Sequence, residues 1–120
     1  MIEAARRRHG GLPNLDFAVA EGQDLSALPA ASRDLVVAVD CFPYLFQAGV
    51  AEAHFRDAAR VLRPGRALAV LNLTYAADPA TDHARALAWA AEAGLRIEQD
   101  GACPFTLWDA AAFVFRRTMG

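Results

Sequence analysis

Hydrophobic residues recur along the chain in two patterns, unbroken apolar runs and helical spacing. Two short runs, Asp34–Asp40 and Ala67–Leu73, are apolar without alternation, which is typical of strands covered on both faces. Between them, Val50–Leu62 places apolar side chains at helical spacing and charged side chains elsewhere, as an amphipathic helix does. Two such strands joined by a helix predict a right-handed βαβ crossover, and therefore adjacent parallel strands in a sheet with helices on its faces.

A turn signal separates the central helix from the second apolar run. Pro64 disfavours the helical conformation at Arg63, and Gly65 can supply the positive φ that a type II turn requires. We therefore predict that the helix closes near Leu62, that the chain reverses through Pro64 and Gly65, and that it then enters a strand at Ala67.

The remaining elements follow from the same patterns. Asp78 is a suitable N-cap for a helix with Pro79 at its first position, and the last two strands alternate apolar and polar residues as an antiparallel pair at a sheet edge does. Cys41–Gly49 is predicted to be a loop. The full prediction is strands near Phe17–Ala20, Leu35–Val39, Ala67–Leu73, Leu95–Glu98 and Phe113–Arg116, with helices near Ile2–Arg8, Val50–Leu62 and Pro79–Ala93.

Composition narrows the class of protein. A chain of 120 residues with 55% hydrophobic and 22% charged residues is one domain at most, and its net charge of −2 gives little support for a nucleic-acid or membrane partner. Cys41 and Cys103 lack metal-ligand spacing, so no metal is expected, and two lone cysteines indicate a reducing cytoplasm. All 12 basic residues are arginine, which we interpret as the codon bias of a GC-rich, bacterial genome.

Polar residues gather where the predicted parallel strands end. In open α/β sheets ligands bind beyond the carboxyl ends of the strands, so these residues form a candidate binding edge. Polar residues also mark ordinary strand-to-loop junctions, and each one alone is open to that simpler interpretation. They are Glu21 and Asp24 after the first strand, Asp40 after the second, and Asn72, Thr74 and Tyr75 after the third.

Several segments, in order, resemble one known family. "MIEAARRR" is similar to the helix after its second strand, "QDLSALP" to its acidic loop after the third strand, and "RDLVVAVDCFPYL" to its fourth strand and exit. "ARVLRPGRALAVLNL" is similar to its characteristic helix-turn-strand leading into the fifth strand, and "LWDAAAFVFRR" to its antiparallel final strand. The chain thus resembles the class I S-adenosylmethionine (SAM)-dependent methyltransferases over nearly its whole length.

This resemblance implies a fold and a set of cofactor residues. The fold is a Rossmann-like α/β three-layer sandwich, a mostly parallel sheet with an antiparallel C-terminal strand. Asp24 matches the acidic residue that binds the adenine amino group, and Leu25 its neighbour, whose backbone N–H is available to a ring nitrogen. Asp40 and Cys41 match the strand exit that lines the methionine and sulfonium portion of SAM.

The acceptor side is less defined by the resemblance. Tyr44, Asn72 and Tyr75 fall where the family meets its substrate, and the charge of the chain favours a small-molecule acceptor. Methyl transfer from a sulfonium depends mainly on positioning, with deprotonation where the acceptor needs it. No general base is assigned, because all three histidines are interpreted as surface, packing or terminal residues (His9, His54 and His83).

The sequence also departs from the family. It shows no glycine-rich loop after a first strand and no acidic residue for the ribose at the end of a second strand, and the double glycine after proline reads Gly65-Arg66. Residues 1–120 therefore resemble a single, incomplete domain, the C-terminal portion of a methyltransferase that lacks the family's first two strands. We expect the chain alone to bind SAM weakly or not at all, so that its activity alone is doubtful.

Two other interpretations stay open. One is a non-catalytic Rossmann-like interaction module that pairs with a partner chain, and the other is an α/β protein with no connection to SAM. A glycine-rich strand-loop-helix encoded in frame upstream of Met1 would favour the methyltransferase over the interaction module. Without the first two strands, Leu35–Val39 would have an unpaired edge, which predicts self-association through that strand.

Overall fold

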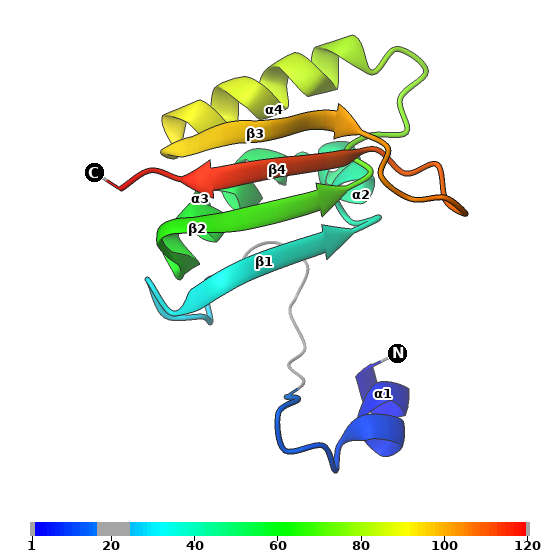
Figure 1. Ribbon diagram of the computed structural model, residues 1–120, viewed down its shortest axis with the longest axis vertical. Helices are drawn as coiled ribbons and strands as arrows, with labels where there is room; N and C mark the ends of the chain where they lie inside the picture. Colours follow the sequence, from blue (N-terminus) through cyan, green and yellow to red (C-terminus); the bar gives the residue numbers. More distant parts are fainter. Residues whose placement is uncertain (1, 17–24, 120) are drawn as a thin grey trace.

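The described part of the chain contains four helices and four strands, mixed along the sequence. The computed structural model describes residues 2–16 and 25–119. The predicted strand at Phe17–Ala20 lies outside the described residues, as does Asp24. In chain order the elements are α1 (Ile2–His9), β1 (Arg33–Val39), α2 (Phe42–Ala48), α3 (Ala51–Val61), β2 (Leu62–Leu71), α4 (Ala80–Glu92), β3 (Leu95–Ala102) and β4 (Ala112–Arg117), as Figure 1 shows.

The described strands form one sheet in the order β1-β2-β4-β3. β1 and β2 are parallel neighbours, with Leu35 opposite Ala67 and Val39 opposite Leu71, as the sequence predicts. β4 lies antiparallel between β2 and β3, so three strands of the sheet run one way and β4 runs the other. The predicted antiparallel pair at the sheet edge is confirmed, but only one of the three neighbouring strand pairs is parallel.

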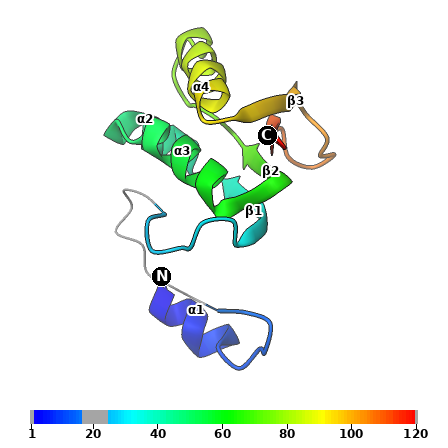
Figure 2. The same cartoon turned by 90° about the vertical axis from the view of Figure 1, so that its left-hand side faces the viewer.

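Three helices cover one face of the sheet. α2, α3 and α4 all lie on the same side in the edge-on view of Figure 2. The core between them and the sheet centres on Phe55 of α3, which is fully buried and whose ring centroid lies 4.8 Å from that of Phe42 and 5.4 Å from that of Phe115. Leu68 and Val70 of β2 point into the same core.

The opposite face of β1 is open in the described part of the chain. Val36 and Ala38 pack against the core, whereas Leu35, Val37 and Val39 are 57%, 52% and 52% exposed. The expectation that this strand is covered on both faces is therefore wrong for the described residues. An unbroken apolar run shows that both faces are apolar, but not that both have a covering layer. α1 does not supply one, because it lies apart from the sheet (Figure 1) and none of its residues is buried.

The junction between α3 and β2 agrees with the prediction only in part: the helix closes where predicted, but Pro64 and Gly65 lie within β2 and not in a turn before it. α3 ends at Val61, Leu62 is extended, and Gly65 has a φ of 81°. β2 nevertheless begins at Leu62 and not at Ala67, because Leu62 already pairs with Arg33 before an irregularity in the register. β2 ends at Leu71, short of the predicted Leu73, because Asn72 turns into the left-handed conformation with a φ of 63°.

The predicted loop Cys41–Gly49 contains a helix, α2. Pro43 lies in its first turn, where its missing N–H costs nothing, and Gly49 ends the helix with a φ of 76°. Phe42, Pro43 and Leu45 are buried against the core, so packing stabilises a helix too short to be stable alone. The prediction of a loop here was therefore wrong, and Pro43 is a helix-start residue.

Candidate functional site

Three of the candidate side chains meet at the carboxyl ends of β1 and β2. Asp40 Oδ1 accepts one hydrogen bond from Asn72 Nδ2 at 2.6 Å and another from the Tyr75 hydroxyl at 2.5 Å. Asp40 and Asn72 both have positive φ, 53° and 63°, which aspartate and asparagine tolerate better than most residues. The two strands therefore end side by side with their polar side chains turned toward each other.

These contacts fix the charge state of the cluster. The hydrogen bond from Tyr75, with a smaller contribution from Asn72, lowers the pKa of Asp40 below its usual value. The same bond to Asp40 raises the pKa of Tyr75, because ionising its hydroxyl would remove the donor and place two negative charges together. At neutral pH the cluster holds one carboxylate and two neutral donors.

Tyr44 extends this cluster from the start of α2. Its ring meets the ring of Tyr75 edge-on with centroids 6.1 Å apart, and the two residues are 60% and 53% exposed. Two exposed aromatic rings beside a carboxylate form a surface suited to a flat or cationic ligand. The four residues Asp40, Tyr44, Asn72 and Tyr75, hereafter the Asp40 cluster, are thus brought together from three separate segments.

Leu25 and Cys41 both line a hollow near the Asp40 cluster, at the carboxyl end of β1. Its volume is about 190 Å³, and its walls come from β1, α2 and α3, with Phe42 and Leu45 among the apolar lining residues. Burial of the Cys41 thiol raises its pKa, so the side chain is a neutral thiol at pH 7. The hollow is therefore apolar and is open to a flat, uncharged group.

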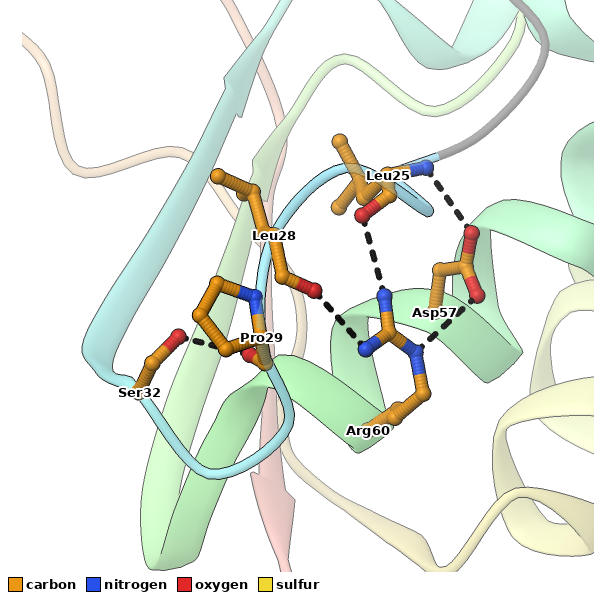
Figure 3. A network of polar contacts seen from close by, with 6 residues as sticks. All are labelled: Leu25, Leu28, Pro29, Ser32, Asp57 and Arg60. Carbon is orange, nitrogen blue, oxygen red and sulfur yellow. Dashed lines mark hydrogen bonds and ion pairs between the residues drawn. The ribbon is translucent and has the colours of Figure 1, made fainter.

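The loop that carries Leu25 is fastened to α3 by Asp57 and Arg60 (Figure 3). The Leu25 N–H donates to Asp57 Oδ2 at 2.8 Å. The Arg60 guanidinium donates to the Leu25 carbonyl at 2.9 Å and to the Leu28 carbonyl at 2.8 Å, and its Nε lies 3.5 Å from Asp57 Oδ1. Two side chains one helical turn apart thus hold both backbone polar groups of Leu25.

The roles of Asp57 and Arg60 are not evident from the sequence. Both occupy polar positions of the amphipathic helix, where a charged residue is ordinarily solvated. Their partners are 32 and 35 residues away for the Leu25 contacts, so no local spacing indicates them. The Leu25 N–H, expected to be available to a ring nitrogen, has a carboxylate oxygen as its partner in this structure.

Residues 2–16 and 25–119 contain neither a cluster of metal ligands nor a helix that could span a membrane. No group of three His, Cys, Asp or Glu side chains there is placed to hold a metal ion. None of the helices in that part of the chain has both the length and the apolar character needed to cross a membrane.

Comparison with known proteins identifies the class of this fold. A putative methyltransferase from Haloferax volcanii, solved in complex with the Trm112 methyltransferase activator, superposes with a TM-score of 0.69 at 18% identity, over 98% of this chain and 68% of that one. A SAM-dependent methyltransferase from Methanosarcina mazei superposes with a TM-score of 0.67 at 13% sequence identity, over 99% of this chain and 78% of that one. A SAM-dependent methyltransferase from Aquifex aeolicus superposes with a TM-score of 0.64 at 16% identity, over 96% of this chain and 61% of that one. The fold is that of the Rossmann-like methyltransferases.

A match to a family model shows the family to which the sequence belongs. A family model described as "Methyltransferase domain" matches residues 1–70, more than half of the chain. The chain belongs to this family, the class I SAM-dependent methyltransferase domains. A search of curated proteins gave no match.

The described residues fit one end of the cofactor that this family implies. An apolar hollow of about 190 Å³ beside a backbone N–H that already points at an acceptor oxygen suits a flat nitrogen heterocycle such as adenine. The hollow is too small for the whole of SAM. Asp40 directly precedes Cys41 in the sequence, and its carboxylate suits the positively charged sulfonium end of SAM.

Proposed function

We propose that this chain contributes the adenine end and the acceptor side of a SAM-dependent methyltransferase site, with a small molecule as methyl acceptor. The observation that carries the proposal is the Asp40 cluster, in which side chains from the ends of β1 and β2 converge beside the hollow of Leu25 and Cys41. Open α/β sheets place their ligands at this edge. Two free cysteines and the all-arginine basic composition favour a bacterial cytoplasm as its location.

Each residue has a role in this proposal. SAM, when bound, supplies an electrophilic methyl group. Leu25 lines the adenine hollow and offers its N–H once Asp57 releases it, and Cys41 lines the side of the hollow next to β1. Asp40 attracts the positive charge of the cofactor. Tyr44, Asn72 and Tyr75 face the acceptor.

We expect the chain alone to bind SAM weakly. The Leu25 N–H must first exchange its carboxylate partner for a neutral ring nitrogen, which is the weaker acceptor. The sequence also shows no acidic residue of the kind that binds the ribose hydroxyls in this family. Two or three charge-assisted hydrogen bonds lost at roughly 1.5–3 kcal/mol each reduce affinity by several orders of magnitude.

The test is an NMR titration of the labelled chain with S-adenosylhomocysteine to millimolar concentration. The proposal expects saturating amide shifts at Leu25, Cys41 and Tyr75, with weak affinity. Asp40→Asn should weaken binding of SAM itself at least threefold, whereas Asp34→Asn at the other end of the same strand should not. Shifts confined to other parts of the chain, or equal effects of the two variants, would contradict the proposed site.

An interaction module remains the second candidate, and a specific observation favours it. Leu35, Val37 and Val39 present an exposed apolar row on β1, and one structural neighbour is a methyltransferase solved in complex with an activator protein. If the titration gives no shift at Leu25 or Cys41, and a protein partner protects the Val37 amide from exchange, this second function replaces the first.

A further inference from the structure

A further cavity lies beside Asn72, on the side away from β1, and no function has been given to it above. Its volume is about 450 Å³, within the range of small-molecule sites. It lies where β2 ends, α4 begins, and β3 and β4 turn toward each other. Leu73 and Phe113, which are 3% and 8% exposed, form its apolar floor, and His83 and Asp100 are polar groups in its wall.

His83 and Asp100 form a hydrogen-bonded pair across this cavity wall. His83 comes from α4 and Asp100 from β3, and Nε2 of the imidazole lies 2.5 Å from Oδ1 of the carboxylate. The ring also lies beside the floor, with its centroid 6.0 Å from that of Phe113. A carboxylate next to Nε2 favours the tautomer with the proton on Nε2, which leaves the lone pair on Nδ1.

Nδ1 of His83 is the group of this pair that a ligand can use. Within the described residues it has no hydrogen-bond partner, since the only hydrogen bond of the ring is the one between Nε2 and Asp100. The carboxylate of Asp78, also in the wall, already accepts a hydrogen bond from the Ala80 N–H at 3.1 Å. A ligand that suits this cavity therefore donates a hydrogen bond to Nδ1 of His83.

Charge excludes one class of ligand. Asp78 and Asp100 place two carboxylates in the wall, and no arginine is among the lining residues. A carboxylate or phosphate ligand would meet like charge without a compensating cation, which is unfavourable in a partly enclosed site. An uncharged molecule with an apolar body and one hydroxyl matches both the floor and the wall.

The cavity is also next to the Asp40 cluster. Asn72 belongs to both, because it donates to Asp40 through its side chain and lines the cavity. A molecule bound over Phe113 would therefore reach the polar edge at which we placed the methyl donor. Sequence reasoning assigned no role to His83, because its partner is 17 residues away on a different element.

We infer that this cavity binds the methyl acceptor, and that the acceptor is a small uncharged ring compound with a phenol-like hydroxyl, held by His83 and Asp100. The identification of this ligand as the methyl acceptor rests on the proposed function. The prediction that the cavity binds such a compound does not. In the transfer, the oxygen forms a bond to the methyl carbon of the sulfonium donor, the sulfur–methyl bond breaks with its electron pair left on sulfur, and the hydroxyl proton passes to His83 Nδ1. Asp100 stabilises the resulting imidazolium.

The test uses the full chain without SAM and four probes of similar size: 4-methylphenol, toluene, 4-methylbenzylammonium and 4-methylbenzoate. The chain has three histidines, so their ring signals can be assigned by single substitutions and followed by NMR at mildly alkaline pH. We expect 4-methylphenol to shift the His83 signals and the Phe113 ring, to bind about three- to tenfold more tightly than toluene, and to leave His9 unmoved. The benzoate should bind least.

Three variants separate recognition from folding. His83→Leu should reduce 4-methylphenol affinity about three- to tenfold and leave toluene affinity unchanged, while His9→Leu in α1 should change neither. If His83→Leu does not fold, Asp100→Asn keeps the ring and should reduce the preference for 4-methylphenol over toluene. Equal affinities for 4-methylphenol and toluene, tightest binding of the ammonium or the benzoate, or shifts away from His83 would each overturn the inference.

The outcome is independent of the SAM titration. Binding of 4-methylphenol at His83 without any SAM response would keep the cavity and remove its role as an acceptor site. A SAM response at Leu25 and Cys41 without 4-methylphenol binding would keep the proposed function and overturn this inference.

Discussion

Asp40 and Asn72 face each other across the ends of two parallel strands, both in the left-handed backbone conformation and joined by a 2.6 Å hydrogen bond. Left-handed residues cannot continue a strand, so each strand ends at its polar residue and turns that side chain toward its neighbour. The geometry that ends β1 and β2 is thus also the geometry that assembles the Asp40 cluster. Two consequences of this arrangement can be measured.

The first consequence is the charge state of Asp40. The hydrogen bond from Tyr75 is the main cause of its lowered pKa, so Tyr75→Phe should raise the pKa of Asp40 toward its ordinary value of 3.8. Tyr44→Phe is the matched control, because Tyr44 touches the ring of Tyr75 but, in the described structure, donates no hydrogen bond to Asp40. Carboxyl carbon shifts followed by NMR as a function of pH give both values.

The same pKa has a consequence for stability. Because the folded chain lowers the pKa of Asp40, the cluster stabilises the fold above pH 3.8, and that contribution is lost as the pH falls through the lower folded value. The stability difference between the wild type and Tyr75→Phe should therefore shrink in acid. A difference that grows below pH 3.8 would show that Asp40 is not the group responsible.

The second prediction concerns the fastening of the Leu25 loop. Arg60→Met removes hydrogen bonds to two carbonyls and the ion pair with Asp57. Because the Arg60 side chain is 36% exposed, water compensates in part, and we expect a loss of about 1–2 kcal/mol in the free energy of unfolding. Denaturant titration measures this loss, and hydrogen exchange should show faster opening at Leu28, whose N–H bonds to the Leu25 carbonyl.

Arg56→Met is the control for this experiment. Arg56 lies one turn earlier on α3, is exposed, and contacts only Glu52 at 3.4 Å in the described structure. An exposed pair at this spacing contributes about 0.3–0.5 kcal/mol. Losses of equal size for the two variants would mean that the loop is held by something other than Arg60.

The fold was largely predictable, and the reasons are local. Pro64 and Gly65 indicate the end of α3 by their own backbone restrictions, although the structure places them within β2 and not in a separate turn. β1 and β2 are recognisable because each is a short, unbroken apolar run. α2 was missed because its seven residues have no polar N-cap side chain and gain their stability from tertiary contacts. The open face of β1 was missed because a sequence pattern cannot show which covering layers are present.

The site was predictable only in part. Asp40, Asn72 and Tyr75 follow strands, so the rule that parallel strands end at one edge was enough to group them. His83 and Asp100, like Asp57 and Leu25, meet through the packing of separate elements, and no spacing in the sequence indicates such a meeting. Long-range pairs of this kind require a structure.

The third prediction tests the backbone at the α3–β2 junction. Gly65 has a φ of 81°, and a Cβ there would lie 2.8 Å from the Met119 sulfur. The methionine can move, but the backbone strain remains, so Gly65→Ala should lower the free energy of unfolding by about 1–2 kcal/mol. Gly11→Ala, which meets no atom within 4 Å and has no positive φ, should have almost no effect. Denaturant titration compares the two, and an equal loss for both would contradict the strain.

The last prediction concerns the open edge and face of β1. β1 pairs only with β2 in the described sheet, and Leu35, Val37 and Val39 form an exposed apolar row along it. Edge strands of stable monomers are ordinarily short, charged or covered, because an apolar edge recruits further strands. We therefore expect the purified chain to self-associate, with a mass by light scattering that rises with concentration.

A charge at the centre of this row should prevent the association. Val37→Glu places a carboxylate where a second chain would pack, and it should give a monomer at concentrations at which the wild type associates. Leu107→Glu is the control: Leu107 is fully exposed but lies in the segment between β3 and β4, away from β1, so the wild-type behaviour should persist. Association should also slow exchange of the Val37 and Val39 amides in the wild type alone. A wild-type chain that stays monomeric at every concentration, or a Leu107→Glu variant that dissociates as completely as Val37→Glu, would show that β1 is not the contact surface.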